Sequence, residues 1–409
     1  MADQPPSWET AAQASTPHHR HQASLEQVVD MSSTAQESLS LAERAAARDT
    51  FYRVVQHFES ADPYITEPRA TRRTLYSQPR LVRYTYEFAR SVESQDIVLR
   101  SFFDSLALDL AANEANLDFT ELAPLFSAYA DYLMDNFFLP LKASTSQTPQ
   151  PSPAIHSAVL RAQGATDSQA YIGTEERLST LRAECLVRDR HRCVISREFS
   201  NAEFGKRLEL YGNEARDDDG ILFSDLDNIK LDILEVAHIL PHSLMKASTG
   251  SEMNASRQAA LSILNMFDRG VVDLINGIDI DRPRNALTLT PLMHGLFGAF
   301  KIYLEAVDGQ YNTYRIKSFL EAPHSRVFNL PITRTLYVTE NRTIDPPSPR
   351  FLAVHCAIAH ILHLSGAGDY IDYILRDMEE HPVRADGTSA LGRLVSLGLG
   401  GWMDGAVYS

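Results

Sequence analysis

The chain has few cysteines, no long apolar run and no excess of basic residues. Its 409 residues include three cysteines, Cys185, Cys193 and Cys356, and no C-x-x-C pair. A small odd number of cysteines argues against a disulfide framework, and the missing pair excludes a zinc ribbon built on one. No stretch approaches the roughly 20 apolar residues that cross a bilayer, and residues 1–24 lack the apolar core of a signal peptide. We therefore expect an intracellular protein, in the cytoplasm or the nucleus.

The balance of charge is acidic. Lys and Arg total 38, Asp and Glu total 53, and the formal net charge is -15. A protein that binds nucleic acid over its whole surface carries a broad basic face, so this balance argues against that class. A local basic groove is still compatible with it, because nearby charges set the field inside a cleft. The hydrophobic content of 44% is ordinary for a globular protein, and the length suffices for two or three domains.

Composition and periodicity divide the chain into five parts. Residues 1–40 are rich in Ser, Gln, Ala and Thr, which predicts a disordered tail. Residues 41–142 carry apolar side chains at a spacing of three to four, which predicts helices. A linker dense in Ser, Thr, Gln and Pro follows at 143–153. After it come a mixed module at 174–338 and a mainly helical C-terminal region at 350–409, so we expect the α+β class.

The mixed module alternates short apolar runs with amphipathic segments. Runs of this length indicate strands, and the longer periodic segments indicate helices. The expected helices are Glu175–Arg190, Ala255–Phe267 and Met293–Leu304, and the expected strands are Cys193–Ser196, Ile233–Ile239, Tyr311–Ile316 and Thr335–Val338.

Two segments of the module carry the residues that point to chemistry. The first ends a predicted strand with Ala-His-Ile-Leu-Pro and contains His238. The second runs from Asn285 after a proline break to His294 at a helix start. Hydrolysis of a phosphodiester needs an activated water and a cation that neutralises the phosphate. One imidazole can take the proton of the water because its pKa lies near neutrality, and another can bind the cation. The ordered set therefore predicts a metal-dependent phosphodiesterase.

Three blocks of the module resemble the HNH endonuclease family, and more closely the HNH-domain proteins of filamentous fungi. The blocks are Arg188–Ser196, Glu235–Pro241 and Asn285–Phe297.

The resemblance implies a ββα-metal fold, in which two antiparallel strands and a helix surround one metal ion. It also implies hydrolysis of nucleic acid, in the first place DNA. In this family pattern His238 is the general base, Asn285 is the structural Asn of the catalytic site, and His294 is a metal ligand. The cofactor implied is one divalent ion, Mg²⁺ or Mn²⁺ in the first place, with Zn²⁺ or Ni²⁺ as alternatives.

The chain departs from the family pattern at two positions. Many members place a metal ligand directly before the base, where this chain has Ala237. The branch that shares this Ala often has Asp one helical turn after the last His, where this chain has Gly298. Glu235 lies on the same side of the strand as Ala237, about 6–7 Å along it, and is either a metal ligand or a structural residue. These departures leave an alternative open, a catalytically degenerate HNH-fold scaffold that binds nucleic acid or protein.

Further candidates lie around these segments. Arg188, Arg190 and Arg192 form a basic run that either contacts a phosphate backbone or is a solvated helix end. His242 is either a phosphate contact or an ordinary loop residue. The C-terminal histidines, His355 among them, are more often packed side chains than metal ligands. The helical flanks offer surfaces for a protein partner.

Overall fold

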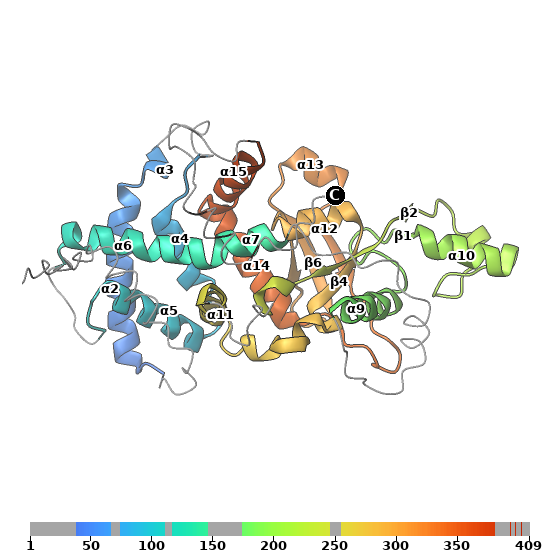
Figure 1. Cartoon of the computed structure of the whole chain (residues 1–409), viewed down its shortest axis with the longest axis horizontal. Coiled ribbons are helices and arrows are strands. Elements are labelled where there is room, and N and C mark those ends of the chain that lie inside the picture. Colours follow the sequence, from blue (N-terminus) through green and yellow to red (C-terminus); the bar gives the residue numbers. More distant parts are fainter. Residues whose placement is uncertain are drawn as a thin grey trace, which may run out of the picture.

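The protein is described by a computed structural model over residues 38–66, 74–110, 117–145, 174–245 and 255–380, with residues 393, 397 and 402. The N-terminal helices gather at one end and the small sheets, with further helices, at the other, and the C-terminal helices lie between them (Figure 1). The α+β class is confirmed by this mixture of elements. Most of the predicted tail and of the predicted linker lie outside the described residues. Residues 143–145 are helical and belong to the end of the preceding helix.

The helical end is formed by the N-terminal part of the chain. Polar residues start its helices: Ser40, Ser77, Ser91 and Asp118 each accept a backbone N–H of the first turn. These caps satisfy N–H groups that have no partner within the helix. The elements in order are α2 (Leu41–Ser60), α3 (Pro63–Thr66), α4 (Gln78–Glu87), α5 (Val92–Ser105), α6 (Phe119–Leu133), the π-helical turn Met134–Phe138 and α7 (Leu139–Thr145).

Two C-terminal helices join this end to the sheets. Helix α14 (Pro349–Leu364) lies in the middle of the molecule and packs on α4 from one side and on a strand from the other (Figure 1). One buried cluster contains side chains from the N-terminal helices, the module and α14. The three parts are therefore held by a common core. No described helix alone is long and apolar enough to cross a membrane, and α14 reaches that test only with α15 (Ala367–Glu380), at a bend of 81°.

The described residues of the module form three small sheets. Strands β1 (Phe199–Ser200) and β2 (Leu231–Asp232) are parallel, whereas β3 (Glu235–His238) and β4 (Ala286–Leu289) are antiparallel. A third, antiparallel sheet has the order β5-β6-β7. Its strands and the helices of the module are β5 (Ile302–Ala306), β6 (Thr313–Ser318), β7 (Ile332–Thr335), α9 (Thr174–Arg188), α10 (Asn201–Tyr211), α11 (Ala255–Phe267), α12 (Pro291–Gly298) and α13 (Ala322–Val327).

The β3–β4 pair separates two faces. Side chains alternate along a strand, so Val236 and His238 share one face while Glu235 and Ala237 share the other. Val236 packs with side chains of α9, and Ala237 lies in the main core. Helix α12 follows β4 directly and contacts both strands. The register therefore directs His238 toward α9 and Glu235 toward α12.

Several predicted elements differ from the observed ones. Helix α11 has the predicted bounds. The predicted strand Cys193–Ser196 is a turn, in which the N–H of Arg197 donates to the carbonyl of Cys193 at 3.0 Å. The predicted helix Met293–Leu304 ends at Gly298, because Phe300 has a φ of 57° and the following residues pair as β5. Apolar runs without clear periodicity fit a helix or a strand equally well, and pairing decides between them.

Candidate functional site

His238 lies at the end of β3, where the strand pair meets α9. Its Nε2 and a carboxylate oxygen of Asp281 are 3.1 Å apart. The side chain is 2% exposed, and Nδ1 has no hydrogen-bond partner among the described residues. Burial lowers the pKa of His238, and the bond to Asp281 opposes this shift. The imidazole is thus held in a fixed orientation with one nitrogen bonded to a carboxylate.

Asp281 was missed in the sequence, and it is the centre of this site. It ends the short 3-10 helix Gly277–Asp281. Its Oδ1 also lies 2.7 Å from Nδ1 of His242, and its Oδ2 accepts from Nε of Arg177 at 3.1 Å. Burial raises the pKa of Asp281, but hydrogen bonds from the two histidines outweigh it and hold the pKa below its usual range. The carboxylate is therefore ionised at neutral pH.

Three side chains of this site form a set of possible metal ligands. One donor atom each from His238, His242 and Asp281 lies within 4.8 Å of the other two. Two imidazoles and a carboxylate suit divalent transition metals. Arg177 places a positive charge on the same carboxylate, which disfavours a further cation there. The donor atoms therefore suit a metal ion, whereas the positive charge of Arg177 disfavours binding one.

Asn285 holds the ends of the strand pair. Its side-chain oxygen accepts the N–H of Leu240 at 2.9 Å, and its amide nitrogen donates to the carbonyls of Leu240 and Ile280, each at 2.9 Å. The residue is fully buried. Its own carbonyl accepts the N–H of Ile239 at 2.8 Å. Asn285 thus fixes the segment that follows His238 through hydrogen bonds made within the chain.

His294 lies on the other face, in the first turns of α12. Thr290 caps this helix and Pro291 starts it. Nδ1 of His294 and a carboxylate oxygen of Glu235 are 2.7 Å apart, and the two side chains are 10% and 25% exposed. One imidazole and one carboxylate fit a hard cation that keeps several waters, and they make a weaker site than three ligands.

The two departures from the family pattern lie beside this pair. Ala237 is fully buried in the core. Gly298 packs against the end of α7, where a Cβ added to it would lie 2.7 Å from the carbonyl oxygen of Thr145. The hydroxyl of Thr145 also donates to the carbonyl of Gly298 at 2.6 Å. A larger side chain at this position would therefore require the backbone to move.

Arg188 occupies a place inside the module. It is 1% exposed, and its guanidinium bonds both carboxylate oxygens of Asp189, at 2.9 and 2.8 Å. It also donates to the carbonyls of Pro283 and Ala286, at 2.6 and 2.9 Å. Arg188 thus ties α9 to the turn before β4 and does not face solvent.

The rest of the basic run faces an acidic loop, Asp217–Asp219. Arg192 bonds Asp217 at 2.8 Å, and Arg190 bonds Asp219. Arg207 of α10 bonds the middle residue, Asp218, at 3.0 Å. The run is therefore largely neutralised within the chain. The side chains of Arg190 and Arg192 are 36% and 14% exposed, so Arg190 is the more accessible of the two.

The C-terminal histidines take packing positions. His355 is buried in α14, stacks on Phe297 with ring centroids 3.8 Å apart, and pairs through Nε2 with the carbonyl of Phe297 at 3.1 Å. Burial lowers its pKa to about 3. His363 stacks on Phe319. Among the described residues these histidines belong to no group of three ligand atoms. His355 instead packs against α12 through its contacts with Phe297.

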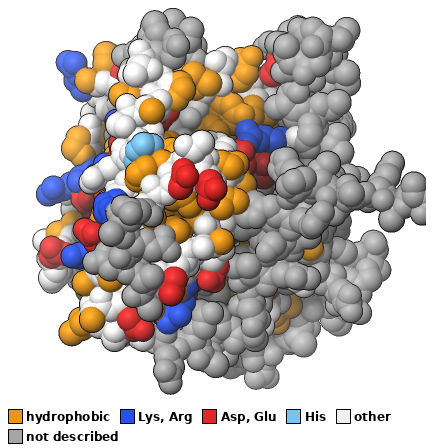
Figure 2. All heavy atoms as spheres, turned by 90° about the vertical axis from the view of Figure 1, so that its left-hand side faces the viewer, with side chains coloured by type: hydrophobic (Ala, Val, Ile, Leu, Met, Phe, Trp, Pro, Cys, Tyr) orange, Lys and Arg blue, Asp and Glu red, His pale blue; other side chains and the backbone are white. Residues whose placement is uncertain are grey.

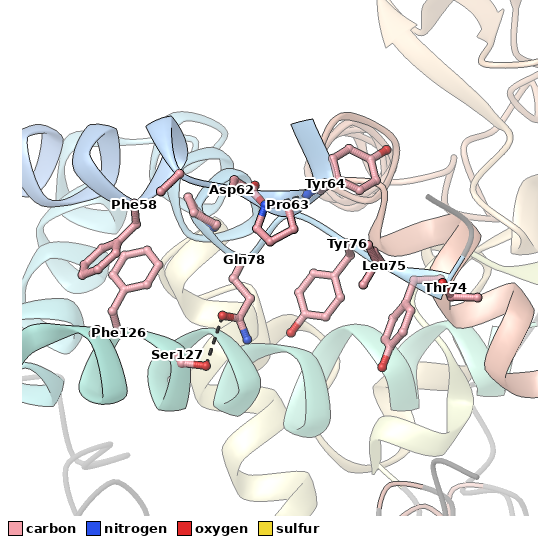
Figure 3. Close-up of a pocket in the computed structure, with 14 residues that line it drawn as sticks. Phe58, Asp62, Pro63, Tyr64, Thr74, Leu75, Tyr76, Gln78, Phe126 and Ser127 are labelled. Carbon is pink, nitrogen blue, oxygen red and sulfur yellow. Dashed lines mark hydrogen bonds between the residues drawn. The ribbon is translucent and has the colours of Figure 1, made fainter. Parts of the chain in front are cut away.

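A cavity of about 410 Å³ lies in the helical end, away from the histidines (Figure 3). Phe58, Phe126 and Tyr76 contribute aromatic walls. Three polar groups of its lining already have partners: Ser127 donates to Gln78 at 3.1 Å, and the hydroxyl of Tyr76 donates to Asp131 at 2.9 Å. These groups offer no recognition pattern for a ligand.

The described side chains on the surface at that end carry charges of both signs (Figure 2). In Figure 2, which faces it, the described basic, acidic and apolar side chains are interspersed. The described part of this face therefore does not form a broad basic surface of the kind that binds nucleic acid.

One comparison with known proteins gives a match. Residues 193–305 match a family model described as HNH endonuclease. The matched part contains His238, Asn285 and His294, and it supports the resemblance found in the sequence. No curated protein and no solved structure matches the chain. The likeness to fungal members stays a prediction.

Proposed function

We propose that this protein is a metal-dependent endonuclease of the HNH type that hydrolyses phosphodiester bonds of nucleic acid, in the first place DNA. One observation carries the proposal. Two of the three histidines of the matched region, His238 and His294, lie on opposite faces of the β3–β4 pair, and each is within hydrogen-bond distance of a carboxylate. A hydrolase needs one such imidazole as a base and ligands of this kind for an ion. In this proposal the ββα-metal module consists of β3, β4 and α12.

The proposed roles follow the positions of the side chains. His238 is the general base, with Nδ1 as the atom that takes the proton of the attacking water. Asn285 holds the segment that carries it. His294 and Glu235 hold a divalent ion, Mg²⁺ or Mn²⁺ in the first place. Such an ion would neutralise charge on the phosphate.

The nucleic-acid contact is proposed at the exposed part of the basic run. Arg190 is the first candidate because its side chain is 36% exposed, and Arg192 is the second. Arg188 is left out of this role because its guanidinium is buried. A phosphate would compete with Asp217 and Asp219 for these arginines, which predicts weak binding that depends on salt.

The test is nicking of a supercoiled plasmid by chelator-treated full chain, before and after Mg²⁺, Mn²⁺, Zn²⁺ or Ni²⁺ is added. We expect cleavage only with an ion, and His294→Ala should need about 10–100 times more of it. Cleavage that persists in the chelator, or no cleavage with any ion by a protein whose circular dichroism shows it folded, contradicts the proposal.

A second candidate is a degenerate HNH-fold scaffold that binds nucleic acid or protein. The contact between Gly298 and Thr145 favours it, because it leaves no room for a ligand at that point of α12. The acidic net charge of -15 points the same way. A folded protein that binds DNA fragments in a gel-shift assay and cleaves none of them would support this candidate.

A further inference from the structure

Asp281 is bonded by three polar side chains. Its Oδ1 contacts His238 and His242, at 3.1 and 2.7 Å, and its Oδ2 accepts a hydrogen bond from Arg177 at 3.1 Å. Its side chain is 1% exposed. The three partners come from β3, from the turn after it and from α9. A buried carboxylate bonded from three directions has little freedom to turn, so the histidine bonded to it is fixed as well.

We infer that Asp281 is the positioning residue of His238: its carboxylate accepts the Nε2 proton and leaves Nδ1 to take a proton from water. The inference rests on the proposed function, in which His238 is the base. A neutral imidazole carries one proton, so a proton held on Nε2 means a lone pair on Nδ1. Nδ1 is buried and has no hydrogen-bond partner among the described residues, so in this tautomer its lone pair is left for a water that enters with the substrate.

The competing use of the same atoms is a metal site. A cation bound by His238 through Nε2 would replace the proton that Asp281 accepts, so the two uses exclude each other. The guanidinium of Arg177, 3.1 Å from the same carboxylate, favours the proton. His242 contributes a second hydrogen to Oδ1 when its proton is on Nδ1. The charges of Asp281 and Arg177 then cancel without an added ion.

The first test reads the tautomer of His238 directly. The full chain is labelled with ¹⁵N in its histidine rings, and His238 is assigned by the signal that disappears in His238→Gln. We expect a proton on Nε2 in the wild type. Asp281→Asn should redistribute that proton, because an amide cannot accept from both histidines and from Arg177 at once. The matched control is Asp279→Asn, since Asp279 lies in the same 3-10 helix and pairs with Arg282 at 3.0 Å instead.

The second test reads the reaction. Asp281→Asn should lower the turnover for plasmid nicking by a factor on the order of 10² to 10⁴ and change KM much less, while Asp279→Asn should keep the wild-type value. A wild-type His238 protonated on Nδ1 would overturn the inference, as would full turnover in Asp281→Asn. So would Zn²⁺ or Co²⁺ that shifts the ring signals of both His238 and His242 at one equivalent. If the wild type does not nick DNA, the proposed function fails, and the ring signals still decide the role of Asp281.

Discussion

The two histidine sites use the same chemistry in different surroundings. At His238 the carboxylate of Asp281 takes two further partners, and the two side chains are 2% and 1% exposed. At His294 the carboxylate of Glu235 is 25% exposed. Burial and the bonds from His242 and Arg177 fix the first pair, whereas the exposure of Glu235 lets the second pair rearrange around an ion or a water. In the proposed function, this contrast gives one strand pair a rigid base on one face and an adaptable ligand pair on the other.

We expect the largest effect when the hydrogen bonds that hold the segment after His238 are removed. Asn285→Ala leaves the N–H and carbonyl of Leu240 and the carbonyl of Ile280 without their partner. Each buried group left unpaired costs about 1–3 kcal/mol, so with three such groups we expect the free energy of unfolding to fall by at least about 3 kcal/mol. Urea denaturation followed by circular dichroism measures it. Asn265→Ala is the matched control, because that side chain accepts one bond, from Gly270 at 3.2 Å, and should cost about 1 kcal/mol.

An equal loss in the two asparagine variants would contradict this account of the rigid side. It would mean that the Asn285 amide contributes no more than an ordinary half-buried side chain.

The position of His294 depends on how α12 packs against the end of α7. Gly298→Ala would place a Cβ 2.7 Å from the carbonyl oxygen of Thr145, so we expect a loss of about 1–3 kcal/mol in unfolding free energy. Gly295→Ala in the same helix meets nothing within 4 Å and should be neutral or stabilising by up to about 1 kcal/mol. Thermal and urea unfolding of the two variants give the comparison. A stabilised Gly298→Ala would show that α7 does not restrict this helix.

The support behind α12 should make the fold sensitive to acid. The pKa of His355 is about 3 in the folded chain, below its ordinary value of 6.5. Between these values the unfolded chain binds a proton that the folded chain refuses, so stability falls as the pH drops below 6.5. The loss from His355 should reach about 2 kcal/mol at pH 5. Urea unfolding at pH 5.0 and 7.5 measures it, and His355→Gln should reduce the difference by that amount. An unchanged difference would place the acid sensitivity elsewhere.

The smallest effect is expected outside both sites. Arg190 pairs with Asp219 at the surface, so Arg190→Gln should change stability by at most a few tenths of a kcal/mol. It should weaken binding to a DNA fragment and lower the salt slope of that binding by about one. Fluorescence anisotropy at several salt concentrations measures both. The buried Arg188 gives the contrast. Arg188→Gln should strongly lower the free energy of unfolding, because it leaves Asp189 buried without its partner, and should not act through a contact with DNA.

Much of the module could be predicted from the sequence because its signals are local. The Ala-His-Ile-x-Pro segment ends a strand as expected, and α11 begins and ends at the predicted residues. His238 and Asn285 can be found despite their separation in the sequence, because each lies in a distinctive local sequence motif.

Asp281 could not be predicted in the same way. It lies in a short 3-10 helix, 43 positions from His238, and only the tertiary fold brings the two together. Its place four residues before Asn285 is the one local signal that could have pointed to it. Arg188 shows the opposite case, since a basic run predicts exposure and a buried partner, Asp189, reverses it. Sequence patterns give the type of a residue, and the fold decides what it faces.

The most direct test of the central claim is metal-dependent nicking of supercoiled plasmid by the wild type, His238→Ala and His363→Ala, with each protein shown to be folded. The proposal predicts cleavage by the wild type and by His363→Ala, because the imidazole of His363 packs on Phe319 and takes no part in the proposed site. It predicts a loss of about 10³-fold or more in His238→Ala. Equal cleavage by all three proteins, or none by any of them with any divalent ion, would contradict His238 as the base of a nuclease.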